Sequence, residues 1–233
     1  MTTIRLQASD LSHVWDTPRR PGARLPDVAL APGESLFLEG PSGAGKSTLL
    51  ASLAGVLRPS SGDVALDGKS YRNLSDTALE SLRADHVGFL FQRLHLVGYL
   101  TVMQNLLLPV QFSSERSRRL RERGEPAKAQ AARLLERLGL DATLWTESAA
   151  RLSVGQQQRV AAVRALMGDP PLLVADEPTS VLDPVSQQSL VDLLLEECRT
   201  RGAVLLAAGH DPRVSERFTR TVRVQTLAKA GSA

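Results

Sequence analysis

The segment GPSGAGKST most strongly constrains how this 233-residue chain folds, because it fits the phosphate-loop pattern GxxxxGK[ST]. It follows an apolar, strand-like run, Ser35–Glu39, and precedes helix-forming residues from Thr48 to Leu57. Its glycines allow positive φ and let backbone amides at a helix N-terminus approach an anion closely. We therefore predict a nucleoside triphosphate site formed by Gly40, Pro41, Ser42, Gly43, Ala44, Gly45, Lys46, Ser47 and Thr48.

Two side chains give this loop its chemistry. Lys46 would place a positive charge on the β- and γ-phosphates, and the Ser47 hydroxyl would be a ligand of Mg²⁺. A glycine-rich turn that only capped a helix would not need this Lys–Ser pair, so we prefer the phosphate-binding interpretation.

The composition fits one α/β domain, or one core with a smaller subdomain, better than two independent domains. The 28 basic residues exceed the 25 acidic ones by three, which is too small an excess to indicate nucleic-acid binding. The single cysteine, Cys198, excludes an internal disulfide, and we expect an unreactive thiol in a reducing compartment. The sequence shows no membrane-length apolar run and no signal-peptide core, so we expect a cytosolic chain.

Strand-like runs on both sides of a helical middle predict the organisation of the chain. The first half predicts a mixed, partly antiparallel sheet with strands at Ile4–Ala8, Ser35–Glu39 and Val64–Asp67. Helical periodicity from about residue 101 to 166 predicts an inserted helical subdomain. After it, apolar runs predict buried parallel strands at Leu172–Ala175 and Ala203–Ala208, joined by a helix at Ser186–Arg199.

A basic run stands out in the helical middle, at Arg116, Arg118, Arg119, Arg121 and Arg123. We expect a solvated helix face, because charge runs of this kind usually face water. A lipid or partner contact is the alternative.

Two carboxylates follow the strand-like run Leu172–Ala175, namely Asp176 and Glu177. Catalytic carboxylates of such sheets emerge at the ends of strands, so with the phosphate loop upstream we expect both to act on the nucleotide. Asp176 would hold Mg²⁺ directly or through water, and Glu177 would be the general base for the attacking water.

The segment LSVGQQQRV, from Leu152 to Val160, resembles the signature motif LSGGQ of ATP-binding cassette (ABC) ATPases. Further family marks occur in the expected order: Trp15, Gln92 in FLFQ, SVLD from Ser180 to Asp183, and His210 in AAGHD. The resemblance extends over about Ile4 to Val224. Because separate motifs recur in order, it is far more specific than any one of them.

The resemblance implies an α/β fold, a P-loop NTPase domain of ABC type with a RecA-like core, an antiparallel β subdomain and an inserted helical subdomain. It implies one domain over residues 1–233. Within it, residues 1–91 and 168–233 would form the core with the β subdomain, and about 92–167 the helical signature subdomain.

The resemblance also implies roles for the other site residues. ATP with Mg²⁺ would be held between two subunits. The signature residues Ser153, Gly155 and Gln156 would face the γ-phosphate of the ATP bound by the opposite subunit. Asp183 would connect the two sites. Gln92 would complete the coordination of Mg²⁺ and water, and His210 would hydrogen-bond the γ-phosphate. The Trp15 ring would stack on adenine, although a half-buried packing role is the alternative.

One residue departs from the signature pattern, since Val154 replaces its second glycine. If the valine side chain points away from the phosphate, the backbone donors survive; otherwise its methyl groups would impede closure. We expect function to be retained, with Val154→Gly changing turnover only modestly.

The segment from Phe89 to Pro109 resembles the cassettes for lipoprotein release, macrolide export and cell division. The resemblance implies a separate transmembrane permease and a second ATPase subunit, expected to be an identical copy that forms a homodimer. It also implies a location in the cytoplasm, on the inner face of the cell membrane, through the membrane partner. The apolar residues Leu94, Leu96, Val97, Tyr99 and Leu100 would either line the groove for a partner helix or belong to the subdomain core.

Two other functions are alternatives to that of a transport ATPase. A regulatory cassette of a division complex would use the same site. A soluble cassette of DNA repair or translation is disfavoured, because the chain has one cassette, no zinc motif and no strongly basic face. No nucleic-acid partner is expected, and His13, His86 and His95, which lack metal-ligand spacing, are expected to be structural.

Overall fold

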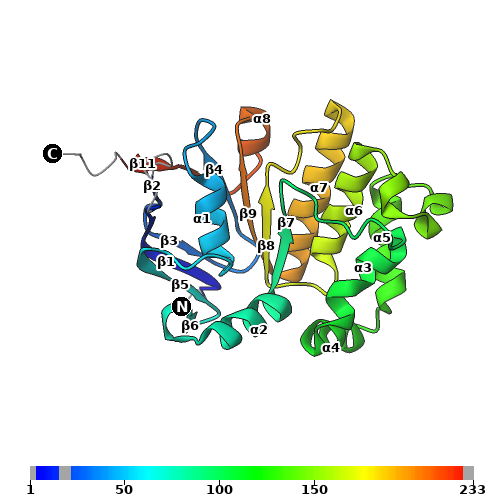
Figure 1. Ribbon diagram of the computed structural model, residues 1–233, viewed down its shortest axis with the longest axis horizontal. Helices are drawn as coiled ribbons and strands as arrows, with labels where there is room; N and C mark the ends of the chain where they lie inside the picture. The colour runs from blue at the N-terminus through cyan, green and yellow to red at the C-terminus, as the bar shows by residue number, and fades with distance from the viewer. Residues whose placement is uncertain (1–3, 16–21, 228–233) are drawn as a thin grey trace.

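The computed structural model describes residues 4–15 and 22–227, and its strands form two sheets (Figure 1). The parallel sheet has the order β10-β4-β9-β8-β7. Its strands are β10 (Arg220–Arg223), β4 (Ser35–Glu39), β9 (Val204–Gly209), β8 (Leu172–Asp176) and β7 (Val87–Leu90). Every neighbouring pair in this sheet is parallel, as the apolar runs at β8 and β9 predict.

The antiparallel sheet has the order β11-β2-β1-β5-β6, and β3 also pairs with β1. Its strands are β1 (Leu6–His13), β2 (Gly22–Arg24), β3 (Val28–Leu30), β5 (Ser61–Leu66), β6 (Lys69–Ser70) and β11 (Gln225–Leu227). The first strand continues beyond the predicted Ile4–Ala8, because a bulge near Asp10 (φ 48°) interrupts the alternation of buried and exposed residues.

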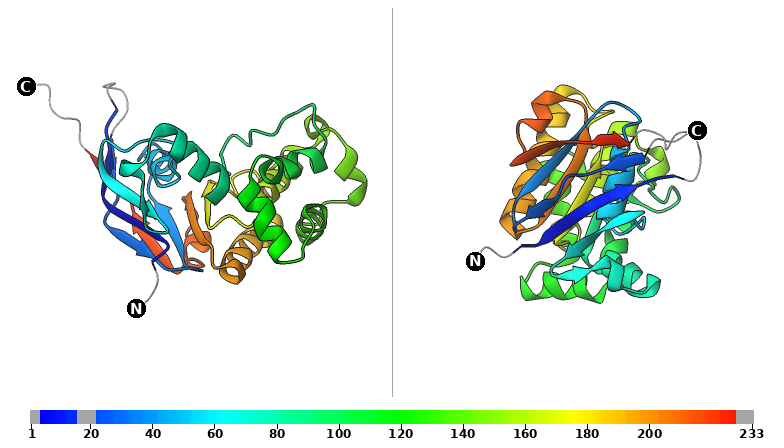
Figure 2. Two further views of the ribbon diagram at one scale, coloured as in Figure 1. Left: turned by 90° about the horizontal axis from the view of Figure 1, so that it is seen from below. Right: turned by 90° about the vertical axis from the view of Figure 1, so that its left-hand side faces the viewer.

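The helix at Lys46–Leu53 lies beside the antiparallel sheet, whereas the helices between residues 102 and 166 lie at the opposite end of the molecule (Figures 1 and 2). The α-helices are α1 (Lys46–Leu53), α2 (Asp76–His86), α3 (Val102–Gln111), α4 (Ser114–Glu122), α5 (Ala127–Arg137), α6 (Val154–Leu166), α7 (Pro184–Arg201) and α8 (Pro212–Ser215). Short 3₁₀ turns lie at Tyr71–Asn73, Ala142–Thr146 and Ala149–Arg151. In the part of the chain just described, no helix combines the length and apolar character needed to cross a bilayer.

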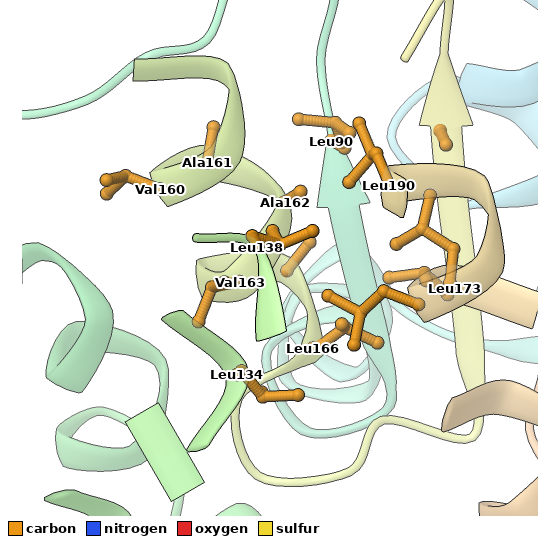
Figure 3. Packing of buried hydrophobic residues seen from close by; sticks show 14 of the residues in the cluster. Leu90, Leu134, Leu138, Val160, Ala161, Ala162, Val163, Leu166, Leu173 and Leu190 are labelled. Carbon is orange, nitrogen blue, oxygen red and sulfur yellow. The ribbon is translucent and has the colours of Figure 1, made fainter. Parts of the chain in front are cut away.

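The parallel strands divide their side chains between two hydrophobic clusters. On β8, Leu172 and Val174 belong to one cluster, and Leu173 and Ala175 to the other. The first cluster contains the leucines of α1 and residues of the antiparallel sheet. The second contains α6 and α7, whose side chains meet those of β7 and β8 (Figure 3). Because side chains alternate along a strand, α1 and α6 pack on opposite faces of the parallel sheet.

Helix ends follow from local sequence. Ser153 caps the N-terminus of α6 and forms a capping box with Gln156. Asp183 caps α7, Pro184 occupies its first turn, and Gly202 (φ 62°) ends it in the left-handed conformation. These caps place the start of each helix at the residues that the sequence motifs mark.

The basic run agrees only in part with the expectation of a solvated helix face, because Arg118, Arg121 and Arg123 are exposed but the other two arginines are not. Arg116 on α4 is only 3% exposed, and its guanidinium donates to the carbonyls of Ala84 (2.8 Å), Val87 (2.6 Å) and Met167 (2.6 Å). Arg119 donates to the carbonyls of Asp85 and Gly168. Carbonyls at the C-terminal ends of α2 and α6 lack helical partners, so they accept these arginine donors. The expectation was wrong for Arg116 and Arg119, because charge alone does not reveal which carbonyls tertiary packing leaves unpaired.

The combination of parallel and antiparallel sheets predicted for this α/β domain is confirmed. The division into residues 1–91, 92–167 and 168–233 stays a prediction. The second hydrophobic cluster runs without a break from the helices α3, α5 and α6 to β8 and α7. The helical part is therefore packed directly on the parallel sheet.

Candidate active site

The phosphate loop joins the end of β4 to the start of α1. Gly45, the N-cap of α1, has φ 90°, and a Cβ added there would lie 2.4 Å from the Cβ of Ala23 on β2. Both the left-handed conformation and this close approach require glycine. The loop thus places backbone amides at a helix N-terminus, where anions are stabilised, which fits the phosphates of a nucleotide.

Lys46 is held inside the loop. Its side chain is 6% exposed, and Nζ donates to the carbonyls of Gly40 (2.8 Å) and Pro41 (3.1 Å). The ammonium is therefore fixed near the loop amides, in a position to exchange a carbonyl partner for a phosphate oxygen.

Asp176 lies at the end of β8 and is 6% exposed. Burial raises the pKa of its carboxyl and the charge of Glu177 adds to this, while a hydrogen bond with Ser47 and the charge of Lys46 oppose it. Its Oδ1 is buried without a hydrogen-bond partner among the described residues. A buried, unpartnered carboxylate oxygen beside a serine hydroxyl fits a hard divalent cation such as Mg²⁺.

No cluster of three or more His, Cys, Asp or Glu residues suited to a metal occurs within residues 4–15 and 22–227. Mg²⁺ commonly takes only one or two protein ligands and completes its shell with waters and substrate phosphates. The small donor set at Ser47 and Asp176 is consistent with that mode.

Glu177 follows β8 directly and has φ 49°, a conformation that is uncommon for this residue type. Its amide donates to the carbonyl of Ala208 (3.0 Å), which holds it beside β9. The amide of Gln92 donates to its Oε2 at 3.4 Å. Unusual backbone at the end of a strand is typical of functional sites, and it brings the Glu177 carboxylate to the Gln92 side chain.

His210 follows β9 and is exposed. Glu177 and His210 line the same hollow of about 120 Å³, together with residues that follow them on the two strands. The neighbouring parallel strands β8 and β9 therefore place both side chains at one edge of the sheet.

Trp15 is half-buried just beyond the end of β1, on the antiparallel sheet. Its ring meets the ring of His13 edge to face, with a centroid distance of 4.6 Å and an interplanar angle of 71°. An aromatic face near the phosphate loop fits an adenine base, and the sheet brings it there through β2, which contacts Gly45.

The signature turn is an exposed helix N-terminus. The hydroxyl of Ser153 accepts from the amide of Gln156 (3.3 Å), and the Gln156 side chain accepts from the Ser153 amide (2.9 Å). Ser153 still has its hydroxyl proton to donate. Val154 is 59% exposed, and a Cβ added at Gly155 would lie 3.5 Å from Leu182. The signature turn is thus adjacent to the SVLD loop.

Asp183 in that loop accepts hydrogen bonds from the amides of Val185 (3.1 Å) and Ser186 (3.0 Å). Bonds from the side chain and the backbone of Ser186 lower the pKa of its carboxyl. The carboxylate therefore stays ionised as the cap of α7 on the exposed surface.

The predicted residues form two groups. One contains the phosphate loop, Asp176, Glu177, Gln92 and His210, and Trp15 lies on the sheet beside it. The signature turn belongs to the other, because α6 packs on the face of the sheet opposite to α1. Among the described residues, no hydrogen bond joins the signature turn to the phosphate loop.

The remaining predictions have mixed outcomes. His86 contacts the Leu82 carbonyl, and His95 packs against Phe91, which agrees with structural roles. Burial raises the pKa of the Cys198 thiol, as expected for an unreactive cysteine. In the apolar segment, Leu94 and Leu96 pack on the core, whereas Tyr99 is 86% exposed. The core alternative therefore holds for Leu94 and Leu96, whereas a contact of Tyr99 with a partner helix stays a prediction.

Sequence reasoning missed two neighbours of the site, Ala23 and His13. Ala23 contacts the Gly45 backbone, and His13 contacts Trp15. Only the two-residue spacing between His13 and Trp15, which places both side chains on one face of a strand, could have indicated the second contact.

Comparison with known proteins identifies similar sequences over most of the chain. A family model described as ABC transporter matches residues 26–180. The lipoprotein-releasing system ATP-binding protein LolD 1 of Rhodopseudomonas palustris is 40% identical over 202 residues, covering 85% of this chain and 84% of that protein. The ABC transporter ATP-binding protein YbbA of Escherichia coli K12 is 42% identical over 198 residues, covering 85% and 83%.

A macrolide export ATP-binding/permease protein, MacB of Hahella chejuensis, is 36% identical over 222 residues, which are 94% of this chain and 33% of that protein. Among solved structures, a dimeric post-hydrolysis state of the ATP-binding cassette MJ0796 bound to ADP and Pi superimposes with a TM-score of 0.79 at 28% identity. That alignment covers 96% of this chain and 99% of the other.

Proposed function

The chain belongs to the ABC transporter family as an ATP-binding, ATP-hydrolysing subunit, and from this premise we propose that two copies pair head to tail around two ATP molecules. One observation carries the proposal. The phosphate loop and the signature turn begin helices on opposite faces of one sheet, so a chain cannot bring its own Ser153 to its own bound phosphate. A second copy in the reverse orientation supplies the missing turn to each site.

Within each site, the residues divide the work. Lys46 and the loop amides bind the β- and γ-phosphates, and Ser47 with Asp176 would hold Mg²⁺, with Gln92 completing the shell. Mg²⁺, when bound, neutralises charge on the phosphate oxygens. Glu177 accepts a proton from the attacking water, and His210 in the same hollow donates to the γ-phosphate.

Closure of the pair couples ATP binding to a conformational change. ATP stabilises the closed state because the Ser153 hydroxyl and the N-terminus of α6 contact the γ-phosphate only there. Loss of phosphate after hydrolysis removes those contacts, and the pair reopens. Asp183, which borders the signature turn, would connect one site with the other.

We further propose that the pair acts on a separate transmembrane permease at the inner face of the cell membrane. The similarity to lipoprotein-releasing and macrolide-export proteins supports this assignment. The exposed Tyr99, between Gln92 and α3, lies in the segment that would contact the permease. Co-purification of a membrane protein from solubilised membranes tests this assignment.

Mixing two inactive variants tests the shared site. Lys46→Ala removes the phosphate contact, and Ser153→Asp keeps an N-cap residue but places a carboxylate against the phosphate. Each variant alone should hydrolyse little ATP. In an equimolar mixture, half of the pairs combine both variants and keep one intact site, so ATPase activity should recover to about a quarter of the wild-type value.

Ser75→Asp is the matched control, because Ser75 caps α2 in the same way and lies outside the site. It should leave the ATPase rate unchanged. If both variants fold normally and their mixture is no more active than either variant alone, the site lies within one chain.

A further inference from the structure

His13 is held on the side of the antiparallel sheet that faces the phosphate loop. It pairs directly with Ala23 across β1 and β2. Residues that face each other in an antiparallel pair place their side chains on the same side of the sheet. The side chain of Ala23 points to Gly45, since a Cβ at Gly45 would lie 2.4 Å from the Ala23 Cβ. The His13 ring therefore lies on the side from which α1 begins.

The same ring contacts the proposed base platform. Its centroid is 4.6 Å from that of Trp15, and the two rings meet edge to face. His13 thus has the aromatic ring of Trp15 on one side and the strand that touches the phosphate loop on the other. In a nucleotide, the part that joins base to phosphates is the ribose.

The imidazole has an unused polar atom. His13 is 8% exposed, and its Nδ1 is buried with no hydrogen-bond partner in the described part of the chain. Buried polar atoms in native proteins nearly always have a partner, so an unpaired one beside a binding site points to a ligand. A neutral imidazole nitrogen either accepts from or donates to a hydroxyl, depending on the tautomer.

We infer that His13 binds the ribose of the nucleotide, with Nδ1 hydrogen-bonded to a sugar hydroxyl. The inference rests on the proposed stacking of adenine on Trp15. It makes His13 a positioning residue that fixes the sugar between the base and the phosphates. Its contribution is to nucleotide affinity and to selection of ribose over deoxyribose.

Calorimetric binding of ADP, 2′-deoxy-ADP and 3′-deoxy-ADP tests the inference without hydrolysis. The wild-type chain should bind ADP about fivefold more tightly than the analogue that lacks the bonded hydroxyl, as for the loss of one neutral hydrogen bond. His13→Phe should lose this discrimination. His13→Asn, whose amide places a polar atom near the position of Nδ1, should retain it.

Two controls separate the possible failures. His86→Phe makes the same exchange on α2 and should leave the discrimination intact. Trp15→Ala should weaken binding of all three nucleotides equally; unchanged affinities would overturn the stacking proposal. Equal binding of ADP and both analogues by the wild-type chain, or equal discrimination by folded His13→Phe, would overturn the ribose contact while ATP binding stands.

Discussion

At the scale of single residues, the site concentrates groups that are costly to bury. Asp176 and Lys46 are each 6% exposed, yet the proposed function needs their charges around phosphate and Mg²⁺. Burial raises the pKa of the Asp176 carboxyl, so the folded chain holds its proton more tightly than the unfolded chain does. The ionised carboxylate therefore lowers the free energy of unfolding at neutral pH.

Asp176→Asn should consequently stabilise the nucleotide-free protein while abolishing hydrolysis. A carboxyl group with a raised pKa contributes favourably to the free energy of unfolding when it is protonated. This contribution is complete below the ordinary pKa of 3.8 and is lost as the pH rises through the pKa of the folded state. The variant's melting temperature in EDTA should exceed the wild-type value at pH 7.5, by about 2–4 °C for each kcal/mol gained. The difference should narrow near pH 4; a less stable variant at pH 7.5 would contradict this account.

Glu177→Gln removes the proposed base but keeps the size and hydrogen bonding of the side chain. We expect hydrolysis to slow by about 10²–10⁴-fold, the usual value of general base catalysis, with ATP binding retained. Because the closed state then persists, size-exclusion chromatography should show a dimer in ATP and a monomer in ADP. A monomeric variant at saturating ATP would argue against the closed pair.

Residues within motifs could be predicted from the sequence, since each motif states a spacing and a chemistry. Lys46 and Ser47 follow from the glycine-rich loop, and Glu177 from a charged strand end. The ribose contact that we infer for His13 could not be predicted, because the position of His13 near the phosphate loop depends on its pairing with Ala23 in a strand that no local pattern indicated. Register between distant segments is a tertiary property.

At the scale of secondary structure, α4 shows how far charge patterning can mislead. The helix carries four arginines of the basic run, and three of them illustrate different environments. Arg116 is buried, Arg119 is partly buried, and Arg118 forms surface ion pairs with Glu115 and Glu122. Burial lowers the pKa of Arg116 to about 10, so it remains charged at neutral pH.

Arg116→Met should destabilise the fold, because it leaves the carbonyls of Ala84, Val87 and Met167 without their donor. We expect a loss of about 3 kcal/mol in urea unfolding, since buried unsatisfied groups cost about 1–3 kcal/mol each and water reaches some of them. Arg118→Met, on the exposed side of the same helix, should cost less than about 1 kcal/mol. Equal losses for both variants would refute the distinction.

Elements with strong periodicity were predictable, and short ones were not. The runs at β8 and β9 are apolar on both faces, as buried parallel strands require. In contrast, β2 and β3 have three residues each and are defined by their pairing with β1. The helix α1 ends at Leu53, before the predicted Leu57, in a turn containing Gly55 (φ 68°).

At the scale of the whole molecule, the helical part and the parallel sheet are joined by charge as well as by apolar packing. Arg133 and Arg137 on α5 both bond to Glu197 on α7, which is 6% exposed. Glu125 and Asp169 pair with neighbouring arginines of the same network. The network therefore joins α5 to α7, which packs on the parallel sheet.

If each site needs two chains, hydrolysis must depend on protein concentration. The ATPase rate per chain should rise steeply as the protein concentration increases, from a low value for separate chains to a plateau once pairs form. Measuring the initial rate per chain over a wide concentration range at saturating ATP checks this. A rate per chain that stays constant at every dilution, and is unaffected by Ser153→Asp, would contradict a shared site.

The placement of α1 and α6 on opposite faces of the sheet also has a genetic consequence. Two alleles, one damaged in the phosphate loop and one in the signature turn, leave one working site when their products pair. If both lesions lie on one allele and its product pairs with an intact chain, each of the two sites contains one lesion. With random pairing, both cells keep about a quarter of the normal number of working sites. In the first arrangement these sites lie in mixed pairs with one site each, and in the second they lie only in pairs of two intact products.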